Sequence, residues 1–351
     1  MPENITIYDI AKEAHVSPAT VSRVLTGNAK VRPEKREAIL SIIEKYNYHP
    51  NALARGLINK ASKTIGFIVP DITNPFFAAT FLEAEKHALS LEYTLILCNS
   101  MNDNRLNRNE LESLYLKMLM EKRADGIIIM GGRVNEKRAI NTQIAELQEI
   151  VRKKPVVFIN GSMRGVKSYN VTTDETDGIN KLVQYLASLG HKDIGFIGGR
   201  KGISSTDVKL SAFESAMKRL HIPYRPEWII PGSFGVEDGY SSMVQLLSQP
   251  NRPTAVMTVN DFNAIGAINA ATDYGLNVPK DISVTGFDGT YLMDVTRPTI
   301  TTISQNYAEL GKKAVEAIAQ VSLGKNFPRN TLIPTQLIIK DSCRAITGTV
   351  L

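Results

Sequence analysis

The feature that most constrains the fold is an alternation of short apolar runs with helical stretches, which begins at Thr64 and occupies most of the chain. Runs this short and this continuously apolar are typical of strands buried on both faces of a parallel sheet. The helical stretches supply the crossover connections that such a sheet requires. The expected strands are Ile65–Val69, Leu95–Cys98, Gly126–Met130, Val156–Ile159, Ile194–Ile197, Ala255–Thr258 and Ile282–Phe287. The expected helices include Phe77–Leu91, Asn109–Lys122, Asp177–Leu189 and Val208–Leu220.

The strands are too many for one small sheet, and a second set begins near Tyr169. We therefore expect a two-lobe α/β core with parallel sheets and a ligand cleft at the carboxyl ends of the strands. A late helix over Tyr307–Leu323 should return to the first lobe, and a strand over Gln336–Ile339 to the second. The predicted division is a first lobe of residues 63–163 with about 293–325, and a second lobe of residues 164–292 with about 326–351.

The segment before this core, Thr6–Leu25, reads TIYDIAKEAHVSPATVSRVL. Apolar residues recur at three- and four-residue steps, and Ser17 followed by Pro18 is a helix start, so the pattern predicts two short helices joined by a tight turn. The outer side of the second helix carries small or hydrogen-bonding residues and a single long one, Arg23. Such a helix fits the major groove of DNA, with Arg23 able to reach a guanine edge. An ordinary helical hairpin is the alternative.

A third helix is expected from Val31 to Tyr46, which completes a small all-α domain over residues 1–48. Residues 49–62 then contain the segment Ala52–Leu57 and a polar linker. A helix of two turns is too short to be stable alone, so this segment is either a plain linker or a switch that folds only against a partner.

Charge and cysteine usage narrow the class of protein. The net charge of +6 weakly favours an anionic partner, and residues 1–60 contribute half of it. The two cysteines, Cys98 and Cys343, form no CxxC pair, so neither a zinc site nor a disulfide scaffold is expected. The N-terminus has no secretory pattern, and no apolar run is long enough to span a membrane. We expect a cytoplasmic protein without a cofactor or metal. An enzyme is not expected either, because Gly198–Gly202 lacks the spacing of a phosphate-binding loop and the histidines show no catalytic order.

Taken together, these segments resemble the lactose-repressor (LacI) family of bacterial transcription regulators over essentially the whole chain. The N-terminal TIYDIAKEAHVSPATVSRVL followed by YHPNALARGL carries the resemblance most specifically. The core segments IGFIVPDITNPFF, VNDFNAIGAINAA, DISVTGFDGT and RPTITTISQN are looser, since periplasmic sugar-binding proteins share the two-lobe core. The resemblance implies a helix-turn-helix domain joined to this core, and a homodimeric regulator that binds a pseudo-palindromic DNA operator, most often as a repressor of carbohydrate genes. A free sugar-binding protein is the distant alternative.

The resemblance also implies which residues meet DNA. The second helix of the motif would read bases through Pro18, Ala19 and Arg23, and the segment Asn51–Leu57 matches a hinge helix that pairs with its copy in the minor groove. Leu57 is the match for the leucine that wedges between bases. The complete expected set is Thr6, Ser17, Pro18, Ala19, Thr20, Ser22, Arg23, Asn51, Ala54 and Leu57.

A sugar or sugar phosphate in the cleft is the effector that the resemblance implies. The matching positions are Phe76, Phe77, Ser205, Lys209, Phe234, Asn260, Asp288 and Gln305. Lys209 departs from the family pattern, which usually has arginine four residues before an aromatic residue, and lysine lacks the flat two-pronged grip of arginine. This opens an alternative in which phosphorylated HPr acts as corepressor, as in catabolite-control members of the family, with Arg297 near its phosphate.

Overall fold

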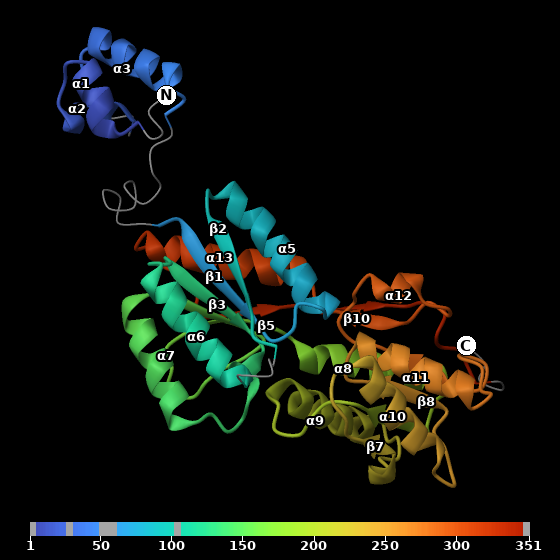
Figure 1. Ribbon diagram of the computed structural model, residues 1–351. Coiled ribbons are helices and arrows are strands. Elements are labelled where there is room, and N and C mark those ends of the chain that lie inside the picture. Colours follow the sequence, from blue (N-terminus) through green and yellow to red (C-terminus); the bar gives the residue numbers. More distant parts are fainter. Residues whose placement is uncertain (1–4, 26–30, 49–61, 102–106, 347–351) are drawn as a thin grey trace. The chain divides into compact units, whose positions relative to one another are not determined.

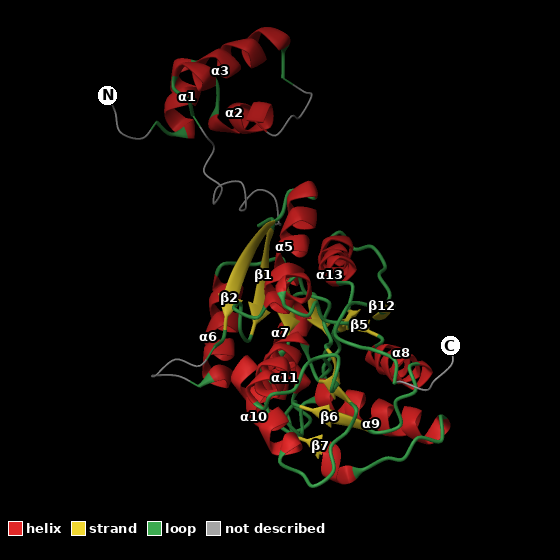
Figure 2. Ribbon diagram, turned by 90° about the vertical axis from the view of Figure 1, so that its right-hand side faces the viewer, coloured by secondary structure: helices red, strands yellow, loops and turns green. Residues whose placement is uncertain are grey.

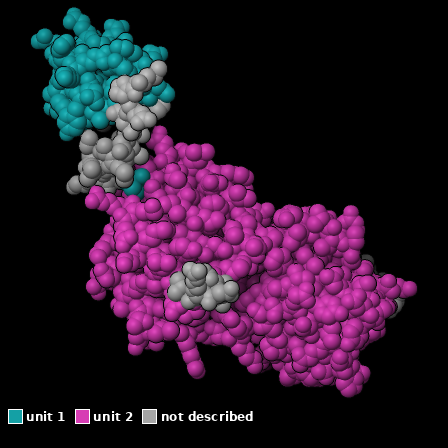
Figure 3. Space-filling model, in the orientation of Figure 1, with its two compact units in different colours: residues 1–62 teal, residues 63–351 magenta. Residues whose placement is uncertain are grey.

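The fold is described from a computed structural model, which places residues 5–25, 31–48, 62–101 and 107–346. The chain divides into two compact units, residues 1–62 and 63–351, coloured separately in Figure 3. Each unit is described by itself. Within the described ranges, no helix is long and apolar enough to cross a membrane.

The first unit contains α1 (Ile7–Glu13), α2 (Pro18–Leu25) and α3 (Pro33–Lys45). α1 begins with a capping box, in which the Thr6 hydroxyl accepts from the Asp9 amide and the Asp9 carboxylate accepts from the Thr6 amide. His15 adopts a φ of +50° in the turn before α2, a conformation that histidine tolerates better than most residues. The small core consists of Ile10, Ala11, Val21, Val24 and Ile39.

The first lobe of the second unit is a six-stranded parallel sheet, in which the strand order is β11-β5-β4-β3-β1-β2. Its strands are β1 (Thr64–Val69), β2 (Thr94–Asn99), β3 (Gly126–Met130), β4 (Val156–Ile159), β5 (Tyr169–Thr173) and β11 (Asn330–Ile333). One face packs on α5 (Pro75–Ser90) and α13 (Tyr307–Ser322), which lie side by side in Figure 1 although more than 200 residues separate them. The other face packs on α6 (Arg108–Glu121) and α7 (Asn141–Lys153).

The second lobe repeats this layered arrangement around a four-stranded parallel sheet, in which the strand order is β7-β6-β8-β9. Its strands are β6 (Ile194–Ile197), β7 (Ile229–Ile230), β8 (Ala255–Thr258) and β9 (Ser283–Thr285). α8 (Glu175–Ser188) and α9 (Ser204–Arg219) share the core on one face, and α10 (Val236–Leu247), α11 (Asp261–Asp273) and α12 (Leu292–Val295) share it on the other. Figure 2 shows helices surrounding the strands in both lobes. An antiparallel pair, β10 (Thr302–Ser304) with β12 (Gln336–Ile338), completes the lobe.

The lobe boundaries differ from those expected from sequence. β5 pairs with β4, so the first lobe extends beyond residue 163 to about residue 173. β10 pairs with β12 of the second lobe, so the return to the first lobe begins after Ser304 rather than near residue 293. β11 pairs with β5, which keeps the chain in the first lobe past residue 325. Both β5 and β11 lie toward the edge of the sheet, where polar residues are tolerated, and their sequences lack the continuous apolar run that marks a buried strand.

Candidate functional site

The outer side of α2 carries the residues expected to read DNA. Val21 and Val24 are buried against the other helices, whereas Ala19 and Arg23 are exposed. Pro18, Thr20 and Ser22 are half-buried. The exposed positions are a methyl group and a guanidinium, which suit contact with a thymine methyl and a guanine edge respectively.

Two of the residues predicted to contact DNA, Thr6 and Ser17, also form hydrogen bonds at the starts of α1 and α2. The Thr6 hydroxyl donates to the Asp9 carboxylate over 2.6 Å. The Ser17 hydroxyl accepts from the Thr20 amide over 3.3 Å, and its oxygen lies 2.9 Å from that of Thr20. These side chains therefore order the exposed ends of α1 and α2. Asn51, Ala54 and Leu57 lie outside the described residues.

All eight predicted effector residues line one cavity between the lobes of the second unit, about 310 Å³ in volume. It lies where the strands of both sheets end, as expected for parallel α/β folds. The lining residues from this set are Phe76, Phe77, Ser205, Lys209, Phe234, Asn260, Asp288 and Gln305.

The start of α5 places two aromatic rings in the first-lobe wall. Asn74 caps this helix by accepting from the Phe76 amide over 3.0 Å. The rings of Phe76 and Phe77 lie 5.8 Å apart and are tilted by 51°. Phe234 and Phe262 line the cleft from the second lobe. The cleft therefore combines apolar ring surface with polar groups, the composition of sites that bind small polar molecules.

Lys209 is buried in the second-lobe wall, with an exposure of 3%. Its ammonium donates to the Val259 carbonyl over 2.9 Å and lies 3.9 Å from the centre of the Phe287 ring. Glu175 Oε1 is 3.4 Å away and also accepts from the Ser205 hydroxyl over 2.5 Å. The charge of Lys209 is thus compensated inside the protein, and its position is fixed before any ligand binds.

A chain of side-chain hydrogen bonds crosses the floor of the cleft. Asn160, at the end of β4, donates to Gln305 over 2.8 Å, and Gln305 donates to Asp288 over 2.6 Å. Burial raises the pKa of the Asp288 carboxyl well above its ordinary value, with the Lys209 charge opposing this shift and Asp261 adding to it. The chain therefore links first-lobe strand ends to a buried acid of the second lobe.

Asn260 acts on the shape of the cleft. Its side chain accepts from the Asn263 amide, which caps α11, and donates to the Phe234 carbonyl over 2.9 Å. Both ends of the amide are therefore bonded within the protein. Asn260 holds the loop that presents the Phe234 ring to the cleft.

Other residues that the sequence patterns did not predict also line the cleft, among them Asp71, Arg108, Asn135, Asn160 and Arg200. Three of these lie just beyond apolar strands: Asn160 directly follows β4, Asp71 lies two residues after β1 and Arg200 three residues after β6. Their position at strand ends was the signal that could have identified them. Arg108 and Asn135 had no such signal.

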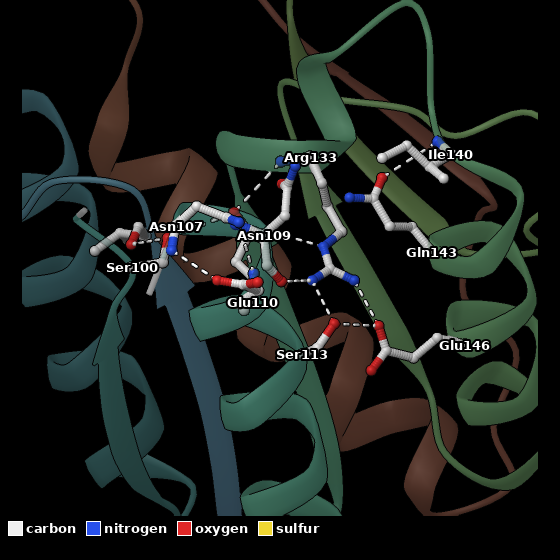
Figure 4. Close-up of polar contacts among 11 residues, drawn as sticks. Ser100, Asn107, Asn109, Glu110, Ser113, Arg133, Ile140, Gln143 and Glu146 are labelled. Atoms are coloured by element: carbon white, nitrogen blue, oxygen red, sulfur yellow. Dashed lines mark hydrogen bonds and ion pairs between the residues drawn. The ribbon is translucent and has the colours of Figure 1, made fainter. Parts of the chain in front are cut away.

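The cleft wall contributed by Gly131 and Gly132 is supported by a buried ionic cluster (Figure 4). Arg133 is fully buried and donates to Glu112 over 2.7 Å and to Glu146 over 2.6 Å. The same guanidinium donates to the Asn109 carbonyl and the Ser113 hydroxyl, so it joins α6 to α7. Burial raises the pKa of the Glu112 carboxyl, and the adjacent Arg133 charge opposes that shift.

Among the described residues, no group of three or more His, Cys, Asp or Glu side chains could hold a metal ion. Burial raises the pKa of both the Cys98 and the Cys343 thiol to about 11, which makes each a poor nucleophile at neutral pH.

Comparison with known proteins gives the same two parts. The model of the bacterial regulatory proteins of the lacI family matches residues 6–51, and the periplasmic binding protein-like domain matches residues 183–343. Catabolite control protein A of Priestia megaterium is 36% identical over 90% of this chain and 92% of its own length. The HTH-type transcriptional repressor PurR of Haemophilus influenzae (strain PittEE) is 34% identical over 97% of this chain and 99% of its own length.

A crystal structure of the lac repressor dimer bound to operator and the anti-inducer ONPF superimposes with a TM-score of 0.86 at 26% identity, covering 98% of this chain and 100% of the repressor chain. These relatives are transcriptional regulators and not enzymes. The helix-turn-helix unit, the two-lobe core and the extent of these matches show that this chain belongs to the lacI family of DNA-binding bacterial transcription regulators.

Proposed function

We propose that this protein is a cytoplasmic, non-enzymatic, homodimeric repressor of carbohydrate genes that binds a pseudo-palindromic operator and responds to a sugar or sugar phosphate in the inter-lobe cleft. The observation that carries the effector assignment is the composition of the cleft. Phe76, Phe77 and Phe234 contribute aromatic rings to its lining, which suit the C–H surfaces of a sugar, and Asp288 and Gln305 contribute hydrogen-bonding groups at its floor.

The proposed switch is a change in the angle between the lobes. An effector that contacts Phe77 in the first lobe and Lys209 in the second binds one angle better than another, and only this difference in affinity can shift the equilibrium. A tenfold change in operator affinity requires about 1.4 kcal/mol of differential binding. Whether the effector releases or recruits DNA is the outcome that the experiment below measures.

Phosphorylated HPr as corepressor remains the less favoured candidate. Arg297 was expected to lie near the phosphate of HPr. Its guanidinium donates to the carbonyls of Thr296 and Asp294. This arrangement supports a local structural role for Arg297.

A thermal-stability screen against sugars and sugar phosphates tests the effector assignment. One compound should raise the melting temperature and change the mobility of an operator fragment in gels. Lys209→Gln should weaken binding of that compound at least tenfold while leaving operator affinity without the compound within about threefold, because the cleft and the α2 surface belong to different units. A shift of equal size in the Lys209→Gln variant would place the ligand elsewhere, and no shift with any compound would favour a protein corepressor.

A further inference from the structure

A second concavity lies at the end of the first-lobe sheet where its strands begin. The cleft lies at the other end, where the strands finish. Its volume is about 620 Å³, and it is lined where β4 and β5 begin and where α7 and α13 end. Val156, the first residue of β4, lines this concavity, whereas Ile159, the last residue, lines the cleft. One strand of four residues, about 10 Å long, therefore separates the two. We call this concavity the amino-edge pocket.

The amino-edge pocket has an unbalanced charge. Its basic lining residues are Arg152, Lys153, Lys154, Lys167 and Arg329, and no acidic residue lines it among those that the structure describes. Lys153 pairs with Glu149 over 2.6 Å on the surface of α7. The other four form no ion pair within the described ranges. Glu149 also interacts electrostatically with Arg152, so one carboxylate stands beside five cations. Cations in such excess repel one another, and a bound anion relieves that repulsion.

Arg329 is held in place for such a role. Its guanidinium stacks on the Tyr169 ring, 4.2 Å from the ring centre, and donates to the Lys167 carbonyl over 3.1 Å. Tyr169 in turn packs edge-on against Phe327, with ring centres 6.3 Å apart. A stacked guanidinium loses little conformational freedom on binding, and its remaining donors match the oxygens of a phosphate group.

The shape of the pocket favours a small ligand over a duplex backbone. Apolar residues, among them Val151, Pro155 and Val321, line the concavity between the basic side chains. A concave site with apolar lining encloses a compact molecule, whereas a nucleic-acid duplex is convex and meets an open basic surface.

We propose that the amino-edge pocket binds a small ligand that carries two or more phosphate groups, through Arg152, Lys154 and Arg329. This site goes beyond the proposed function, because it involves neither the DNA-binding helix nor the cleft. A ligand in this pocket would contact the start of β4, and the other end of that strand lines the cleft.

Calorimetric titration of the full chain with inorganic pyrophosphate, in the absence of DNA and sugars, tests the proposal. We expect one site per chain, and at least tenfold weaker binding in the Arg152→Gln/Lys154→Gln variant. The matched control is Lys192→Gln/Lys218→Gln, which removes the same charge from exposed positions of the second lobe and should change the affinity less than twofold. Circular dichroism checks that both variants are folded.

Four outcomes would overturn the proposal. Pyrophosphate fails to bind the unmodified protein, or the control variant loses as much affinity as the pocket variant. Arg200→Gln, in the cleft, abolishes binding while the pocket variant retains it. In the fourth outcome, the protein binds no pyrophosphate, and the pocket variant lowers the salt dependence of operator binding. This face would then be a nucleic-acid contact.

Discussion

Lys137 of the first lobe and Asp207 of the second lobe form an ion pair of 2.6 Å. The backbone reinforces this contact, since the Lys137 amide donates to the Gly202 carbonyl over 2.9 Å and Glu136 forms an antiparallel bridge with Ile203. Ile203 also lines the cleft. The contact therefore depends directly on the angle between the lobes at the edge of the proposed effector site.

Removing this ion pair should weaken effector binding. Lys137→Ala and Asp207→Ala should each lower effector affinity by up to about fivefold, because an ion pair this exposed contributes about 0–1 kcal/mol. Binding assays on the two single variants and the double variant give the coupling energy. Lys86→Ala, which breaks a pair within α5, is the control. Strictly additive effects would show that the pair does not sense lobe closure.

Base reading should depend mainly on Arg23. Arg23→Ala should cost about 1–3 kcal/mol of specific operator affinity, the value of a good two-pronged base contact. Arg23→Lys is the matched control, because it keeps the charge and loses the fork. We expect the lysine variant to retain the salt dependence of binding and to lose sequence discrimination in footprinting. An unchanged footprint in both variants would remove Arg23 from the recognition surface.

The buried cluster beneath the cleft wall should make Gly132 sensitive to substitution. Gly132 has a φ of +64°, and an added Cβ would lie 2.1 Å from Glu112 Oε1. Arg133 holds this carboxylate in place through its other oxygen, Oε2. Gly132→Ala should destabilise the protein by more than about 2 kcal/mol, by backbone strain and steric clash together.

Gly324→Ala separates these two causes. Gly324 has a φ of +72° with no atom within 4 Å of the added Cβ, so this variant should cost only about 1–2 kcal/mol. Urea unfolding of both variants gives the comparison. Equal losses would mean that Glu112 moves aside and that the cluster is not rigid.

Mild acid should weaken the second lobe through His191. The ring nitrogens lie 2.9 Å from Thr254 Oγ1 and 3.1 Å from the Arg344 carbonyl oxygen, and burial lowers the pKa of this side chain. The folded state then binds fewer protons than the unfolded state. The stability that the neutral His191 side chain contributes is therefore fully present above the ordinary histidine pKa of about 6.5, and it declines as the pH falls below that value.

The single tryptophan, Trp228, is buried in the same lobe and reports this unfolding by fluorescence. The urea concentration at the midpoint of unfolding should decrease as the pH is lowered from about 7 to about 5, and His191→Gln should make this decrease smaller. His221→Asn, at an exposed histidine whose positive φ asparagine tolerates, should leave it unchanged. A pH dependence that persists in His191→Gln would assign the effect to other groups.

Much of the architecture follows from local patterns. Buried strands such as Gly126–Met130 and Val156–Ile159 are continuously apolar because both faces are covered by helices, so their sequence alone indicates their environment. The helix starts at Thr6 and Ser17 are equally local, since a capping side chain acts within its own turn. The cleft residues were identified by family resemblance, and the structure brings all of them to one cavity.

Sequence by itself therefore determined the two kinds of domain, most of the buried strands and the outward face of α2. Tertiary structure alone decided which lobe β5 and β11 join, because strand pairing depends on partners far along the chain. It also decided that Lys209 is neutralised by Glu175, that Arg133 ties α6 to α7 and that five cations share one pocket. Burial and charge compensation depend on distances between segments remote in sequence, and no local pattern encodes those distances.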